Sequence, residues 1–138
     1  MMGLAAIRNA LASHINGLTT GVALHWPNLP APPPGASVHG DVHFLFSTPY
    51  AATLGRTGED EHTGLVQIDL HAPQGTGESA VLAAADAIRD ACQAGTVTTH
   101  DGQPVTITGC GIGPFFVEGA RFGAPVSIYF RARTHRSL

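Results

Sequence analysis

The feature that most constrains the fold is a change of hydrophobic period between residues 64 and 95. Val66, Ile68 and Leu70 alternate with polar residues, which predicts a strand with one buried face. After a loop at residues 72–77, apolar side chains recur at helical spacing, at Val81, Leu82, Ala85, Ile88, Ala91 and Cys92. Gly95 is placed to end this helix. We therefore expect a strand–loop–helix unit at the centre of the fold.

The rest of the chain predicts one more helix and several strands. Apolar residues at three- and four-residue intervals predict a helix over residues 3–17. Alternating patterns predict strands at 22–26, 38–46 and 105–108, the last interrupted by glycines, and a hairpin formed by 115–118 and 121–133. This order favours the α+β class, with a mostly antiparallel sheet of about four to five strands and two helices on one face. We expect a single domain over residues 1–138, with long loops at 27–37 and 47–63.

Composition excludes some classes of function. Charged residues make up only 12% of the chain, the sequence contains no Lys, and the net charge is −3. A nucleic-acid-binding module needs a basic face, so this class is not expected. No apolar run approaches the roughly 20 residues that span a bilayer, and no secretory signal is recognisable, so we expect no membrane contact. Cys92 and Cys110 could pair, but two buried, reduced side chains are the favoured interpretation.

Polar side chains with metal-binding chemistry alternate along two of the predicted strands. His39, Asp41 and His43 share one strand face, and Gln67, Asp69 and His71 share another. Imidazole and carboxylate groups are suitable ligands for zinc. However, no cluster has a recognised ligand spacing, so a solvated or interface-facing polar surface is favoured, and we predict no metal site. We expect the second face of the sheet to be fully polar.

No motif in the chain predicts catalysis. The sequence lacks a nucleophile elbow. The turn Gly75-Thr76-Gly77 precedes a helix, but no Lys follows it, and Glu78 would repel an anion at the helix N-terminus. We therefore predict no catalytic residues and no cofactor.

The central unit also carries a family resemblance. The stretch from Gly64 to Glu78, which reads GLVQIDLHAPQGTGE, and the alanine-rich helix through Arg89 resemble tail terminator proteins of long-tailed bacteriophages (siphoviruses). Trp26-Pro27 after the first helix, Gly113-Pro114 and the stretch from Pro125 to Arg131 are also similar to this family. The resemblance covers most of the chain, although residues 50–63 match nothing in the family.

The resemblance implies a structural virion protein. Such subunits have an α+β fold, form a hexameric ring, end the growing tail tube and join it to the head. Expected partners are therefore further copies of the chain, the major tail tube protein and the connector or stopper protein of the head–neck region. DNA would pass through the lumen without specific binding. The expected location is the tail–head junction of the virion, assembled in the host bacterial cytoplasm, and related proteins occur in phage-like gene transfer agents.

Three surfaces are candidates for assembly. The first is the polar strand face, expected to meet the lumen or a neighbouring subunit. The second is a contact loop, and the third is a basic C-terminal end. Their residues are His39, Asp41, His43, Gln67, Asp69 and His71; Arg56, Glu59, Asp60 and Glu61; and Arg131, Arg133 and Arg136. Two other interpretations stay open: another neck component, such as a head-completion or connector protein, and a small metal-dependent hydrolase that uses the polar face.

Overall fold

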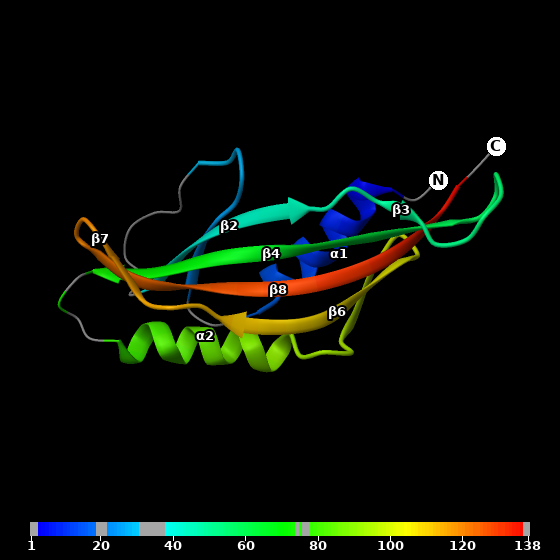
Figure 1. Ribbon diagram of the computed structural model, residues 1–138. Helices are drawn as coiled ribbons and strands as arrows, with labels where there is room; N and C mark the ends of the chain where they lie inside the picture. The colour runs from blue at the N-terminus through cyan, green and yellow to red at the C-terminus, as the bar shows by residue number, and fades with distance from the viewer. Residues whose placement is uncertain (1–2, 19–21, 31–37, 74, 76–77, 137–138) are drawn as a thin grey trace.

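The computed structural model describes residues 3–18, 22–30, 38–73, 75 and 78–136. Within these residues, the chain forms two helices and eight strands, with four strands after each helix (Figure 1). The helices are α1 (Leu4–Asn16) and α2 (Ser79–Ala91). The strands are β1 (Val22–His25), β2 (Val38–Phe46), β3 (Tyr50–Ala51), β4 (Glu59–Pro73), β5 (Val97–His100), β6 (Gln103–Ile112), β7 (Phe116–Glu118) and β8 (Arg121–His135).

The sheet is larger than the sequence predicted, and it is mixed. Its strands follow the order β1-β2-β4-β8-β6-β5, with β3 beside β4 and β7 beside β8. The prediction of about four to five mostly antiparallel strands is therefore wrong in number. It also missed that β1 pairs with β2 in parallel. Two short strands were not predicted, β3 and β5, because they carry too few residues for a periodic pattern to be read.

The predicted contact loop is mostly strand. Residues 59–63 belong to β4, which pairs with β8 over its whole length from Glu59↔His135 to Pro73↔Arg121. β3 adds a further pairing to the same end of β4. Main-chain hydrogen bonds to β8 hold this polar stretch in the sheet, because strand pairing does not require apolar side chains. The long loop predicted at 47–63 is thus reduced to the connections around β3.

Both helices pack against one face of the sheet, as the sequence predicted. Alternate residues of β4, from Val66 to Ala72, are buried together with Val126, Ile128 and Phe130 of β8. The buried faces of α1 and α2 complete the same core, through Ile7, Leu11, Val81 and Ile88. In Figure 1, α2 runs below the sheet and α1 lies behind it. The opposite face of the sheet carries no helix among the described residues, and we call it the outer face.

Residues with positive φ form the tight turns of the sheet, and one helix ends earlier than predicted. Asp101 and Gly102 both have positive φ between β5 and β6, and Gly119 has φ 59° in the β7–β8 hairpin. A register shift between Ile107 and Gly109 forms the predicted irregularity in β6. However, α2 ends at Ala91 rather than continuing to Gly95. Most of the predicted 27–37 loop (residues 31–37), and Thr76 and Gly77, lie outside the described residues.

The two cysteines are free, but only one is buried. Cys92 is inaccessible, and burial raises the pKa of its thiol to about 12. Cys110 is partly exposed on β6, so the prediction of two buried side chains holds for Cys92 alone.

Candidate assembly surface

The structure brings together the six residues predicted for the polar strand face. β2 and β4 are antiparallel neighbours, and their register places His39 opposite His71, Asp41 opposite Asp69 and His43 opposite Gln67. The intervening residues of both strands, such as Val42 and Ile68, are buried against the helices. Because side chains alternate between faces, all six lie on the outer face. We call them the histidine–aspartate patch.

Asp41 is the most heavily contacted carboxylate of this patch. Its Oδ1 lies 3.3 Å from Nδ1 of His25, and its Oδ2 lies 3.5 Å from Nε2 of His71 and 3.8 Å from Nη1 of Arg121. Sequence reasoning missed His25 and Arg121. The parallel pairing of β1 with β2 places His25 opposite Asp41. A parallel pairing cannot be predicted from a local sequence pattern.

The histidines of the patch are packed rather than free. The rings of His39 and His71 stack, with centroids 5.6 Å apart and planes inclined by 11°. Burial is the main cause that lowers the pKa of His71, followed by the positive charge of Arg121; the nearby Asp41 carboxylate opposes both. His71 lies in the interior of this patch, with only 13% of its side chain exposed.

The Asp69 carboxylate, like that of Asp41, contacts side chains of its own sheet. Its Oδ1 accepts a hydrogen bond of 2.8 Å from Nε2 of Gln67, and its Oδ2 lies 3.4 Å from Nε2 of His43. Both carboxylates of the patch therefore already face donors on their own sheet. The described residues contain no group of three or more His, Cys, Asp or Glu side chains arranged to hold a metal ion. The arrangement is suited to a contact surface.

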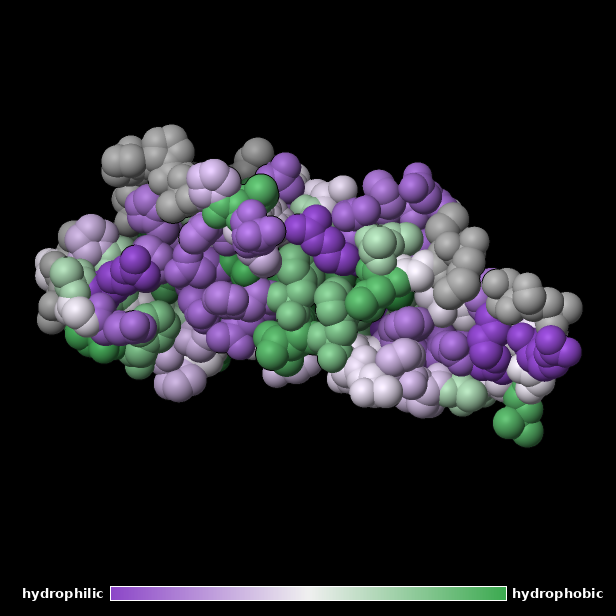
Figure 2. Space-filling model, turned by 90° about the horizontal axis from the view of Figure 1, so that it is seen from above, coloured by the Kyte–Doolittle hydropathy of each residue, from purple (hydrophilic) through white to green (hydrophobic). Residues whose placement is uncertain are grey.

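The outer face is not fully polar, contrary to the prediction. Leu45, Leu65 and Tyr129 stand opposite one another on β2, β4 and β8. Leu45 is 50% exposed and Tyr129 is 46% exposed. Figure 2 shows hydrophobic atoms interrupting the polar surface in the middle of this view. Each of these residues stands next to apolar residues in the sequence, as Leu45 does between Phe44 and Phe46, so the pattern could not show that one apolar row would remain uncovered.

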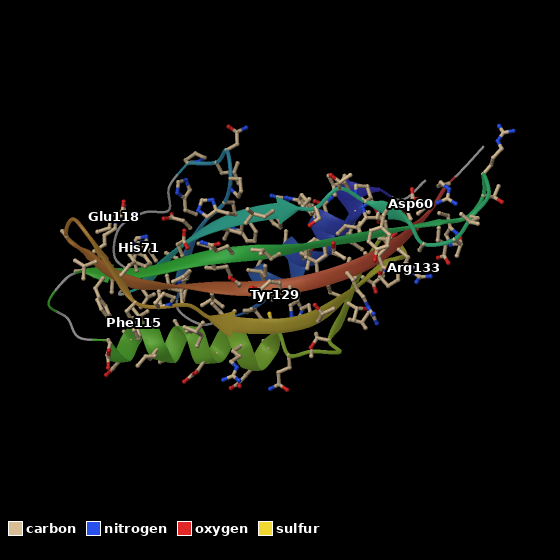
Figure 3. The ribbon with its side chains drawn as sticks, in the orientation of Figure 1. Asp60, His71, Phe115, Glu118, Tyr129 and Arg133 are labelled. Atoms are coloured by element: carbon tan, nitrogen blue, oxygen red, sulfur yellow. The ribbon has the colours of Figure 1, made fainter. Side chains whose placement is uncertain are left out.

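The predicted contact loop and basic end meet at the far end of the sheet. Nη2 of Arg133 lies 3.5 Å from Oε2 of Glu61, and Nη1 of the same residue lies 3.8 Å from Oε1 of Glu59. Arg136 forms an ion pair with Asp60. Figure 3 shows the labelled Asp60 and Arg133 at this end, away from His71. These two candidate surfaces are therefore one mixed-charge end rather than an acidic and a basic surface.

The remaining members of these two sets are more accessible. Arg131 is exposed on β8, opposite Thr63 and Thr106 of the neighbouring strands. Arg56 is exposed in the turn that follows β3.

None of the described helices is long and apolar enough to cross a bilayer.

Comparisons with known proteins identify relatives of this fold. A family model described as phage tail terminator protein matches residues 6–130. One solved structure has a TM-score of 0.73 at 20% identity, with 96% of each chain covered. Another, from the virion of a native gene transfer agent particle, has a TM-score of 0.57 at 19% identity and covers 95% of this chain and 96% of that one. No curated protein matches the sequence significantly.

Proposed function

The chain belongs to the phage tail terminator family, and we propose that it forms a homohexameric ring that ends the tail tube of a long-tailed phage or phage-like particle. The observation that carries this proposal is the family match, which extends from α1 through most of β8. A chain of a gene transfer agent virion shares the fold, which supports the same class of role. In this role the protein is structural and catalyses no reaction.

The proposed ring joins two other components of the particle. On one side it meets the major tail tube protein, and on the other the connector or stopper of the head–neck region. The ring would assemble in the host bacterial cytoplasm and remain at the tail–head junction of the virion. Subunits of such a ring need contact surfaces for neighbours, and the outer face and the mixed-charge end supply two surfaces of different chemistry.

The histidine–aspartate patch is proposed to face either the lumen or a neighbouring subunit. Its two carboxylates are offset by Arg121 and by the donors of the surrounding histidines. A surface with little net charge has little attraction for phosphate, which would allow DNA to pass without binding. The same surface can also accept a neighbouring subunit at small electrostatic cost.

Oligomeric state and tail capping test the proposed function. Light scattering and electron microscopy of the purified protein should show a six-membered ring. Added to tail tubes that lack a terminator, the ring should cap one end of each tube. A protein that stays monomeric and does not cap tubes would contradict the proposal.

One charge reversal separates the two placements of the histidine–aspartate patch. In Asp69→Arg, a lumen-facing patch should leave the ring intact but retard DNA passage, because the lumen gains positive charge. A patch at a subunit contact should instead prevent ring formation, since the new charge would be buried without a partner. Asp86→Arg, on the exposed side of α2, makes the same change in charge and is the matched control.

A further inference from the structure

One edge of the sheet has no partner strand over much of its length. β6 covers β8 from Arg131 to Val126, and β7 continues along the same side of β8 from Gly123 to Arg121. On the far side of β6, β5 pairs only with Gln103–Thr106. Among the described residues, no strand pairs with this far side of β6 beyond Ile107, or with the far side of β7. We call residues 108–118 the open edge.

The open edge carries little of the charge that usually protects an edge strand, because Glu118 at its end is its one charged residue. The sequence contains no Asp, Glu, Lys or Arg from Gly102 to Val117. Phe115 and Val117 are 39% and 61% exposed, and among the described residues Phe115 stacks on Phe122 alone, with centroids 5.1 Å apart. Exposed edges normally carry charges that prevent pairing with another chain. An edge with a single charge at its end and exposed apolar side chains is therefore suited to being covered.

Two glycines of the open edge leave space above the sheet. Gly109 and Gly111 have no positive φ, and a Cβ on either would meet nothing within 4 Å. By contrast, a Cβ on Gly123 of β8 would lie 1.9 Å from the carbonyl oxygen of Leu70. A glycine inside a strand often marks a place where another backbone approaches closely. Gly109 lies at the register shift of β6, whereas at Gly111 the described residues supply no such backbone, and the space there is open to a neighbouring chain.

The opposite edge of the same sheet has matching character. β1 pairs with β2 on one side, and no described strand pairs with its other side. The sequence from Asn9 to Gly40, which includes β1, contains no Asp, Glu, Lys or Arg. Apart from Glu118 at the end of the open edge, the charged residues of the sheet lie on the strands between these edges. Both edges therefore carry little charge, and both offer main-chain groups that no described strand pairs with.

We propose that the open edge of one copy pairs with β1 of the next copy, so that the sheet continues from subunit to subunit. This inference rests on the proposed ring and assigns its subunit contact. Joining two different edges is a head-to-tail contact, which closes into a ring when the rotation between copies permits. Pairing of two identical edges would stop at a dimer. The exposed Phe115 and Val117 would then be covered by the neighbouring copy.

Disulfide cross-linking of co-expressed chains tests this contact. One chain carries Gly111→Cys and the other carries Ala23→Cys, both with Cys110→Ser and with the buried Cys92 unchanged. Positions 111 and 23 both lie at outer-face register positions, opposite Ser127 and His39. A second pair, Gly109→Cys with Ala23→Cys, detects the same contact if the register between the two chains is shifted by two residues. Asp86→Cys with Ala23→Cys is the control.

Cross-links between unlike chains in at least one of the two pairs, and none in the control, are the expected result. Rings that form without such cross-links would overturn this inference and leave the proposed function standing. Cross-links of the Gly111→Cys chain to itself would show pairing of like edges and would also overturn it. Absence of any oligomer in light scattering would contradict both the inference and the proposed function.

A charge placed on the open edge provides a second measurement. Gly111→Lys should weaken ring assembly about tenfold or more, because the ammonium would stand at the seam between the two chains and lose water there without an ionic partner. Ala120→Lys, in the exposed turn of the β7–β8 hairpin, should leave assembly unchanged. Circular dichroism should show both variants folded, since the added side chains meet open space. Equal assembly of the two variants would overturn the inference.

Discussion

The imidazole rings of His39 and His71 stack across β2 and β4, with centroids 5.6 Å apart. Nε2 of His71 also lies 3.5 Å from Oδ2 of Asp41, the oxygen that Arg121 approaches to 3.8 Å. Burial, then Arg121, and to a smaller degree His39 lower the pKa of His71, whereas Asp41 raises it. The balance keeps the His71 ring neutral at pH values where it would be protonated in the unfolded chain.

This balance predicts that protonation of His71 destabilises the fold. Its folded pKa is below the ordinary value of 6.5, so the unfolded state binds more protons as the pH falls. The stability contributed by neutral His71 is therefore present above pH 6.5 and is lost as the pH falls through the folded pKa. Urea unfolding between about pH 8 and pH 5 should show a smaller decrease in His71→Gln than in the natural chain. His135→Gln, at a side chain 80% exposed, is the control; equal decreases in all three proteins would contradict the prediction.

Gly123 should be indispensable for the pairing of β4 with β8. A Cβ at this position would lie 1.9 Å from the carbonyl oxygen of Leu70 and 2.9 Å from Cα of His71. Both atoms belong to backbone, so the strands would have to separate. Gly123→Ala should lower the free energy of unfolding by about 2 kcal/mol or more. In Gly111→Ala the new methyl group meets open space, and the change should stay within about 0.5 kcal/mol. Similar losses in the two variants, measured by urea unfolding, would argue against this explanation.

The parts of the fold that could be predicted from sequence are those with a strong local period. The helices at α1 and α2 and the strands β2 and β4 each bury one face, and their apolar spacing shows it. The size of the sheet could not be predicted in this way. The first five residues of β4, from Glu59 to Thr63, are polar, and main-chain pairing with β8 holds them in the sheet. Such a stretch has no hydrophobic period from which a strand could be predicted.

The candidate surfaces also divide into those with a local sequence pattern and those that depend on long-range strand pairing. The histidine–aspartate patch was predictable because its residues alternate with buried ones on β2 and β4. The pairing of Arg133 with Glu61, and of Arg136 with Asp60, depends on which strands are neighbours in the sheet. That relationship joins residues about seventy positions apart in the chain, and no local pattern carries it. Two predicted surfaces therefore became one.

Arg8 should stabilise the packing of α1 against the sheet. Its guanidinium carbon lies 5.1 Å from the ring centroid of Phe44 and 5.9 Å from that of Trp26. The two rings stack on each other with centroids 6.4 Å apart. Arg8→Ala should lower the free energy of unfolding by about 1 kcal/mol, because it removes a cation–π contact and the covering side-chain stem. Trp26 fluorescence during urea unfolding measures the effect. Arg89→Ala on α2 touches neither ring and is the control; an equal loss there would contradict the assignment.

Arg136 should hold the turn at residues 53–58 against the end of β8. Its Nη2 and Nε donate to the carbonyl of Gly55 at 2.6 and 3.1 Å, and its Nη1 donates to the carbonyl of Glu59 at 3.0 Å. The main-chain N–H of Arg136 donates to the carbonyl of Gly58 at 2.8 Å. Hydrogen bonds from a charged donor are worth more than those from a neutral one. The side chain of Arg136 is therefore a structural clamp.

Removing this clamp should cost more stability than removing a nearby exposed ion pair. Arg136→Ala should lower the free energy of unfolding by about 1–2 kcal/mol. Amide exchange should accelerate at Glu59, whose N–H donates to Oγ1 of Thr53 within the same turn. Arg133→Ala removes contacts of 3.5 and 3.8 Å from a half-exposed side chain, and should cost less than about 1 kcal/mol. If Arg133→Ala proved as destabilising as Arg136→Ala and exchange at Glu59 stayed slow, the carbonyl contacts of Arg136 would not be what holds this turn.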